Sequence, residues 1–266
     1  MRAFSLIGLV LLLSGLALAA DPPAPKPWDW MIDGDRREAL VVLPETPSDT
    51  PAPLVFAFHG HGGNMEGFGH RVALRKHWPE AIAVYMQGLP TPSRLDPQGK
   101  KPGWQTQTSD ATNRDLKFLD TVLATLRKKH AIDEDRIYAT GFSNGGGFTY
   151  LLWSARPKLF AAYAPCAAIL REPENSKLEP APILHIAGER DQVALFEMQL
   201  KTMAKVREIN GCQEIPVEWG LGGKLYPSKT KAGAPFASLI HPGGHIVPNH
   251  SIEMIVKFFK EHPRQR

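Results

Sequence analysis

Residues 136–156 of the chain read RIYATGFSNGGGFTYLLWSAR. The first five residues are typical of a strand, and the apolar run at 148–155 is typical of a helix. Between them, Gly141, Ser143 and Gly145 form the pattern G-x-S-x-G. Strand and helix approach so closely at such a turn that its flanking positions must be nearly free of side chains. The stretch therefore predicts a strand, a sharp turn that exposes the Ser143 hydroxyl, and a helix whose N-terminus points toward it.

A serine hydroxyl is a weak nucleophile unless a base takes its proton, so an acid and a histidine are expected later in the chain. A strand predicted at 183–187 leads into Gly188-Glu189-Arg190-Asp191. Asp191 follows the end of that strand, where a carboxylate can reach an imidazole. Glu189 is a rival on the same loop, and capping the next helix is another use for Asp191.

The candidate base is His245, in the segment PGGHIVP at 242–248. This glycine-flanked loop follows a strand predicted at 237–241 and precedes the last predicted helix, so its imidazole can bend over the edge of the sheet. His241 and His250 are competitors. We expect His241 to point sideways at the strand end and His250 to be exposed near the helix start.

Stabilising a developing oxyanion takes two backbone amides. One is expected from Asn144, directly after the serine. The other is expected from His61, because the strand at 54–59 ends in the glycine-rich run HGHGGN. A zinc site at His59 and His61 is the alternative, but no Cys, Asp or Glu with matching local spacing accompanies them.

Strand-like and helix-like segments alternate along most of the chain. This alternation predicts an α/β fold with a mostly parallel central sheet and helices on both faces. The first two strands, separated by a Pro-rich segment, can instead form an antiparallel pair at one edge. The predicted strands are 39–43, 54–59, 82–86, 136–141, 161–164, 183–187 and 237–241; the predicted helices are about 65–78, 113–130, 144–155, 194–210 and 251–261. The segment 89–101 is expected to be a long functional loop.

The first nineteen residues have the pattern of a secretory signal peptide. Arg2 precedes an apolar run too short to span a bilayer, and Ala17-Leu18-Ala19 is a small-x-small cleavage site. We therefore divide the chain into a signal peptide at 1–19, a Pro-rich linker at 20–35 and one catalytic domain at 36–266. A secreted or periplasmic protein is expected, with no membrane association after cleavage.

Composition is that of an ordinary globular protein, with 43% hydrophobic and 22% charged residues. The formal net charge is +4, and no block of five or more Lys or Arg occurs, so we expect no nucleic-acid partner. The chain has two cysteines, Cys166 and Cys212. In an oxidising compartment they can form one disulfide or stay as two thiols, and the sequence leaves both alternatives open.

Several separate segments together resemble one family. They include FHGHGGN (58–64), PGW (102–104), the run 115–147, GERD (188–191) and PGGHIVP (242–248). Over residues 36–259 the chain resembles the α/β-hydrolase esterases grouped with polyhydroxybutyrate depolymerases and feruloyl esterases. The resemblance implies that Ser143 is the nucleophile, Asp191 the acid and His245 the base, and that the His61 amide helps to hold the oxyanion.

These inferences converge on a secreted serine esterase that needs no metal or cofactor. Its expected partner is an ester, either a small molecule or an oligomer: an aryl ester such as feruloyl, an acetylated sugar or a hydroxyalkanoate. No appended polymer-binding domain is seen, which favours a small soluble ester. Trp104 and Gln105 are expected to contact the substrate, with core packing as the alternative for Trp104. A peptidase of the same fold and a non-catalytic binding protein are the rival functions.

Overall fold

The computed structural model describes residues 26–46, 50–107, 112–171, 178–231 and 233–264. Through these residues runs a ten-stranded sheet with the strand order β1-β2-β4-β3-β7-β8-β9-β12-β11-β10. Its strands are β1 (Trp28–Ile32), β2 (Asp35–Val42), β3 (Ala52–Phe58), β4 (Ile82–Met86), β7 (Ile132–Phe142), β8 (Ala162–Cys166), β9 (Ile183–Gly188), β10 (Val217–Trp219), β11 (Gly223–Tyr226) and β12 (Phe236–His241). The neighbours from β4 to β12 are parallel, and antiparallel strands extend both edges.

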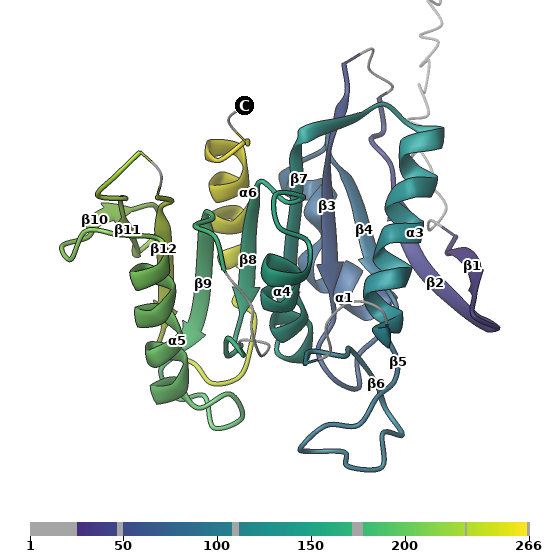
Figure 1. The fold of residues 1–266 in the computed structure, drawn as a ribbon, viewed down its shortest axis with the longest axis horizontal. Helices are drawn as coiled ribbons and strands as arrows, with labels where there is room; N and C mark the ends of the chain where they lie inside the picture. The colour runs from purple at the N-terminus through teal and green to yellow at the C-terminus, as the bar shows by residue number, and fades with distance from the viewer. Residues whose placement is uncertain (1–25, 47–49, 108–111, 172–177, 232, 265–266) are drawn as a thin grey trace, which may run out of the picture.

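Helices cover both faces of the sheet (Figure 1). The helices are α1 (Met65–Val72), α2 (Leu74–His77), α3 (Arg114–Lys129), α4 (Asn144–Ala155), α5 (Phe196–Ile209) and α6 (Ser251–Glu261). Buried side chains of α3, α4 and α5 share one hydrophobic core, and those of α1, α2 and α6 share the other. This three-layered arrangement confirms the predicted α/β-hydrolase fold class.

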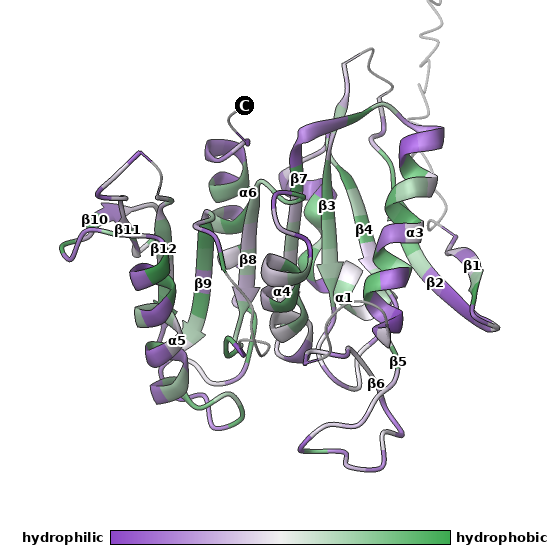
Figure 2. Ribbon diagram, in the orientation of Figure 1, coloured by the Kyte–Doolittle hydropathy of each residue, from purple (hydrophilic) through white to green (hydrophobic). Residues whose placement is uncertain are grey.

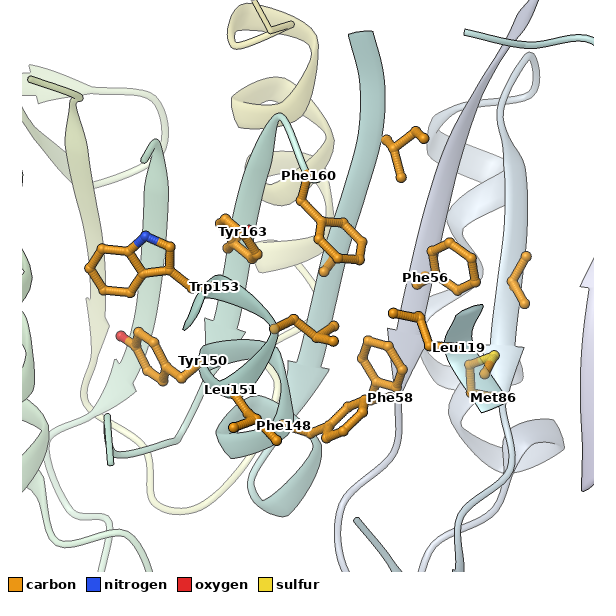
Figure 3. Packing of buried hydrophobic residues seen from close by; sticks show 14 of the residues in the cluster. Phe56, Phe58, Met86, Leu119, Phe148, Tyr150, Leu151, Trp153, Phe160 and Tyr163 are labelled. Carbon is orange, nitrogen blue, oxygen red and sulfur yellow. The ribbon is translucent and has the colours of Figure 1, made fainter. Parts of the chain in front are cut away.

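The two cores explain why strands such as β3, β4 and β8 are apolar along their whole length. Hydrophobic residues concentrate on the central strands, whereas the outer faces of the helices carry polar residues (Figure 2). Aromatic rings join strand to helix in the core on the α4 side: Phe58 of β3 meets Phe148 of α4 edge to face, with 5.0 Å between ring centroids (Figure 3). Burial on both faces is what a parallel sheet between two helical layers requires.

Each of the seven predicted strands and five predicted helical segments has a counterpart in the structure, with shifted ends for several of them. Five strands were not predicted: β1, β10, β11 and the two-residue pair β5 (Leu89–Pro90) and β6 (Pro102–Gly103). The predicted helix at 65–78 is divided, because Ala73 adopts a left-handed conformation with φ of 42° and ends α1. The next amide, that of Leu74, donates to the Tyr85 hydroxyl at 2.8 Å.

The alternative in which the first two predicted strands form an antiparallel pair at one edge is wrong. β4 lies between β2 and β3, antiparallel to β2 and parallel to β3. The strand predicted at 54–59 is β3, which pairs with β4 on one side and with β7 on the other. Its complete burial on both faces therefore fits a central position.

The predicted linker at 20–35 extends too far. Residues Trp28–Ile32 form β1, which pairs with β2 across a turn at Asp33 and Gly34, both with positive φ. Trp30 packs against the core and donates from its Nε1 to Thr125 Oγ1 at 3.0 Å. The folded part thus begins before residue 36. The predicted signal peptide and residues 20–25 lie outside the described residues.

Cys166 and Cys212 are free thiols, so the disulfide alternative is not realised. The sheet separates them: Cys166 packs in the core shared with α6, whereas Cys212 packs in the core shared with α3, α4 and α5. Burial raises the pKa of both thiols, which disfavours the thiolate needed for exchange.

None of the helices within the described ranges is both long enough and apolar enough to cross a membrane.

Candidate active site

Ser143 occupies the turn between β7 and α4, as the sequence predicts. Its backbone has φ of 56° and ψ of −117°, and its amide donates to the Cys166 carbonyl at 2.8 Å. A Cβ on Gly141 would lie 2.3 Å from the Gly145 carbonyl oxygen, and one on Gly145 would lie 2.2 Å from that of Phe58. Only glycine fits at both positions, so the G-x-S-x-G pattern holds Ser143 in a strained conformation.

His245 lies between the Ser143 hydroxyl and the Asp191 carboxylate. Its Nε2 is 2.7 Å from Ser143 Oγ, and its Nδ1 is 2.8 Å from Asp191 Oδ2. The ring packs on that of Phe142, with 4.8 Å between centroids. An imidazole placed in this way can accept the serine proton while the carboxylate stabilises the cation that forms.

Asp191 faces His245 and does not cap α5, whose N-cap residue is Leu195. Its side chain is buried, and Oδ1 accepts from the amides of Val193 and Ala194 at 2.8 and 2.9 Å, ahead of α5. Oδ2 faces His245 and also accepts from Gln199 Nε2 at 3.1 Å. Gln199 was not predicted, because a single glutamine within an amphipathic helical pattern carries no distinguishing signal.

The structure separates the predicted residues from their rivals. Glu189 is exposed, although it lies two residues from the buried Asp191. His241 is buried at the end of β12, where its Nδ1 accepts from the Gly243 amide at 3.1 Å. His250 is exposed at the start of α6. None of the three is hydrogen-bonded to Ser143 among the described residues.

The predicted oxyanion residues lie next to the serine. A Cβ on Gly60 would be 3.4 Å from Ser143 Cβ, so the chain that follows β3 passes directly beside the hydroxyl. Within the described residues, no hydrogen bond occupies the amide of His61 or that of Asn144, the latter in the first turn of α4. Helix amides at this position have no partner of their own and are free to bind an anion.

A cavity of about 540 Å³ opens beside Ser143. Its walls come from the predicted long loop and from the segments after β8 and β9. Residues that line it include His61, Thr91, Arg94, Gln107, Ala168 and Val193. The loop at 89–101 therefore shapes the site, as its length suggested.

Trp104 and Gln105 also line this cavity, but their side chains are engaged elsewhere. Trp104 is 1% exposed, stacks on Phe148 and donates from Nε1 to the His59 carbonyl at 2.8 Å. The Trp104 ring therefore packs in the core, as the alternative interpretation of this residue expected. Gln105 accepts from the Arg114 amide through Oε1 at 2.9 Å, which ties it to the start of α3.

Two contacts that the sequence did not reveal fix the walls to the serine turn. The Asn144 side chain accepts from the Trp104 amide at 2.6 Å and donates to the Trp104 carbonyl at 3.1 Å. His61 Nε2 lies 3.2 Å from Asp96 Oδ2. A hydrogen bond from the Lys101 amide lowers the pKa of the Asp96 carboxyl, which favours the anion facing His61.

The zinc alternative for His59 and His61 is not supported. His59 is buried, its Nε2 accepts from the Gly88 amide at 3.0 Å, and its Nδ1 is 2.7 Å from the Gly60 carbonyl. Both ring nitrogens of His59 are therefore engaged in hydrogen bonds with backbone groups. Across the residues the structure describes, no three His, Cys, Asp or Glu side chains are grouped to hold a metal ion.

Comparison with known proteins agrees with the fold and with an esterase. Residues 31–168 match the family model described as acetyl xylan esterase (AXE1). A probable feruloyl esterase C of Aspergillus clavatus is 26% identical over 213 residues, which cover 79% of this chain and 75% of that protein.

Solved structures show the same fold at low sequence identity. An acetyl xylan esterase from Aspergillus awamori matches with a TM-score of 0.65 and 14% identity over 88% of this chain and 99% of that one. A Bacillus cereus carboxylesterase matches with a TM-score of 0.59 and 14% identity over 85% and 94%.

Fold, site and relatives together define the class of the protein as a carboxylic ester hydrolase of the α/β-hydrolase type. The matched segment spans about half of the sequence. The chain belongs to the acetyl xylan esterase (AXE1) family.

Proposed function

We propose that the protein is an exported serine esterase in which Ser143, His245 and Asp191 form the catalytic triad. The observation that carries this proposal is the unbroken pair of hydrogen bonds, 2.7 and 2.8 Å long, that links the strained serine through the imidazole to the carboxylate. The cavity beside Ser143 supplies room for a substrate.

Acylation begins when Ser143 Oγ attacks the ester carbonyl. His245 Nε2 takes the hydroxyl proton, and the Asp191 carboxylate accepts a hydrogen bond from Nδ1–H and stabilises the imidazolium. The carbonyl oxygen becomes an oxyanion, which the amides of His61 and Asn144 hold. Collapse of this intermediate breaks the ester bond, and His245 passes its proton to the leaving alcohol.

Deacylation repeats these steps with water. His245 takes a proton from the water as it attacks the acyl-enzyme, a second oxyanion forms, and the proton returns to Ser143 as the acid leaves. Both half-reactions use one imidazole that moves protons between two neighbouring oxygens.

The substrate class that we propose is an acetyl or aryl ester of a hydroxyl-rich molecule such as a sugar. The family description and the feruloyl esterase relative support these acyl groups. The cavity is in the size range that encloses a small aromatic acid. Hydroxyl and amide side chains on its wall, those of Ser93, Thr106 and Gln107, suit a carbohydrate. Hydroxyalkanoate oligomers, the other predicted substrate, remain a prediction.

Export is the second part of the proposal and rests on the sequence of residues 1–19. Expression of the full-length chain in a bacterial host should yield a mature protein that begins at Ala20 in the periplasm or medium. Amino-terminal sequencing checks this. A protein that keeps its first nineteen residues and stays in the cytoplasm would contradict export.

The catalytic assignment is tested with Ser143→Ala and the matched control Ser154→Ala. Ser154 lies on α4, and its hydroxyl donates to the Leu151 carbonyl. Ser143→Ala should lower kcat on p-nitrophenyl acetate by at least about 10⁴-fold and abolish labelling by a fluorophosphonate, with the melting temperature maintained. Ser154→Ala should keep the wild-type kcat and should still be labelled by the fluorophosphonate. Undiminished turnover in Ser143→Ala would overturn the triad.

A substrate panel on the wild type then tests the substrate class. We expect higher kcat/KM on methyl ferulate or acetylated xylo-oligosaccharide than on a hydroxybutyrate oligomer or a peptide anilide. Preference for the anilide would favour the peptidase alternative. Absence of both turnover and fluorophosphonate labelling would favour a non-catalytic binding protein.

A further inference from the structure

Behind Asp191, on the side away from His245, three polar side chains form a buried chain. Gln199 of α5 donates to Asp191 Oδ2, and its Oε1 lies 3.1 Å from His185 Nε2 on β9. His185 Nδ1 lies 2.6 Å from the Tyr150 hydroxyl. All three side chains are 0–1% exposed, and Tyr150 is among the buried residues that α4 contributes (Figure 3).

The orientation of the Gln199 amide follows from its neighbours. Its nitrogen faces Asp191 Oδ2 at 3.1 Å and the Ala194 carbonyl oxygen at 2.6 Å. Both neighbours only accept hydrogen bonds, so the reversed amide would place oxygen against oxygen. Oε1 therefore faces His185 and acts as an acceptor there.

This orientation fixes the tautomer of His185. A neutral imidazole has one donor and one acceptor nitrogen, so Nε2 carries the proton toward Gln199 and Nδ1 accepts from the Tyr150 hydroxyl. Burial lowers the pKa of His185 to about 4, which keeps the ring neutral near pH 7. The remaining group, Tyr150, has a pKa raised well above its ordinary value by burial, so its hydroxyl keeps its proton.

All donors then point toward the same carboxylate. Tyr150 donates to His185, His185 donates to Gln199, and Gln199 donates to Asp191. From the other side, His245 donates to the same Oδ2, while two backbone amides occupy Oδ1. Four hydrogen bonds saturate the Asp191 carboxylate and leave it one rotational position.

We propose that Gln199, held in its orientation by His185 and Tyr150, is a positioning residue that fixes Asp191 Oδ2 toward the imidazole of His245. The inference rests on the proposed function, because it assigns Gln199 a role only through the Asp191–His245 pair. Without the Gln199 donor, the carboxylate loses one of the two hydrogen bonds that hold Oδ2, and the imidazole is aligned less often for proton transfer.

The direct test replaces Gln199 by methionine, which has a similar volume and no donor. Gln199→Met should lower kcat on p-nitrophenyl acetate on the order of tenfold and leave KM within about twofold, since the residue does not line the cavity. The matched control is Tyr138→Phe, which removes a buried hydroxyl that has no hydrogen-bond partner among the residues described. It should leave kcat unchanged.

A double-mutant cycle separates positioning from general damage to the fold. In an Asp191→Ala background, Gln199→Met should change the residual rate by less than about twofold, because its only route to the reaction is gone. An equal loss of kcat in both backgrounds, or wild-type kcat in Gln199→Met, overturns the inference. Turnover that survives Ser143→Ala overturns the proposed function instead, so the two failures are distinguishable.

Tyr150→Phe keeps the inference testable if Gln199→Met does not fold. This smaller change removes the donor to His185 Nδ1 and frees the ring to adopt the other tautomer. We expect kcat to fall on the order of threefold with KM unchanged. A kcat equal to that of Tyr138→Phe would show that the chain beyond Gln199 does not position Asp191.

Discussion

Removing the carboxylate of Asp115 should destabilise the protein far more than removing an exposed one. Asp115 Oδ1 lies 2.8 Å from Arg37 Nη2, and the two side chains are 0% and 1% exposed. Oδ2 accepts from the Gln105 amide at 2.8 Å. This pair joins β2 to α3 and to the segment that carries the cavity wall.

The magnitude follows from what Asp115→Ala leaves behind. The Arg37 guanidinium would stay buried with no carboxylate, and burial already lowers its pKa. Breaking a buried ion pair by removing one partner costs about 3–5 kcal/mol. For a domain of this size, each kcal/mol lowers the melting temperature by roughly 2–4 °C. A loss of about 4 kcal/mol therefore corresponds to a fall of roughly 8–16 °C.

The assay is thermal unfolding followed by circular dichroism, with urea unfolding at 25 °C as a second measurement. The control is Glu134→Ala, which removes a carboxylate bonded to Arg127 at 2.7 Å, with side chains 37% and 42% exposed. This variant should lose less than about 1 kcal/mol. If Asp115→Ala unfolds at the same temperature as Glu134→Ala, the reasoning from burial is wrong.

Three further predictions concern the turn at Ser143, the two thiols and stability in acid. Gly145→Ala should lower stability by about 3 kcal/mol or more and abolish esterase activity, because the new Cβ would meet the Phe58 carbonyl; normal activity in a soluble variant would contradict this. Cys166 and Cys212 should react with iodoacetamide only after unfolding, and dithiothreitol should not change the melting temperature; mass spectrometry of the native protein checks this. The unfolding free energy should fall by roughly 3 kcal/mol between pH 6.5 and 4, because His185 takes up a proton only when unfolded, and should level off above pH 6.5. In His185→Gln, urea unfolding should show a smaller fall of the unfolding free energy over the same pH range.

The features that local geometry determines could be predicted from the sequence. Gly141 and Gly145 are required by a backbone approach within a few residues of Ser143, so the turn is visible as a pattern. Asp191 and His245 follow the ends of strands in the expected chain order. The structure brings these side chains together, and their catalytic roles await the experiments above.

Other features depend on which face of the sheet a residue occupies. A strand buried on both faces has no alternation of polar and apolar residues, so nothing in the sequence shows which core the Cys166 side chain of β8 enters. For the same reason, His185 within the run ILHIAG gave no sign that it meets Tyr150. Trp104 was uncertain because an aromatic residue suits a core and a cleft equally well.

The double hydrogen bond between Asn144 and Trp104 has a consequence for how this enzyme can diversify. Asn144, whose amide follows Ser143, is joined through its side chain to the wall of the cavity. A change that remodels the wall near Trp104 therefore also disturbs the group proposed to hold the oxyanion. Exposed side chains on other parts of the wall, such as those of Leu95 and Val193, can vary without disturbing this link. New acyl preferences should therefore arise from changes in the exposed wall residues, whereas Asn144 and Trp104 should change only together.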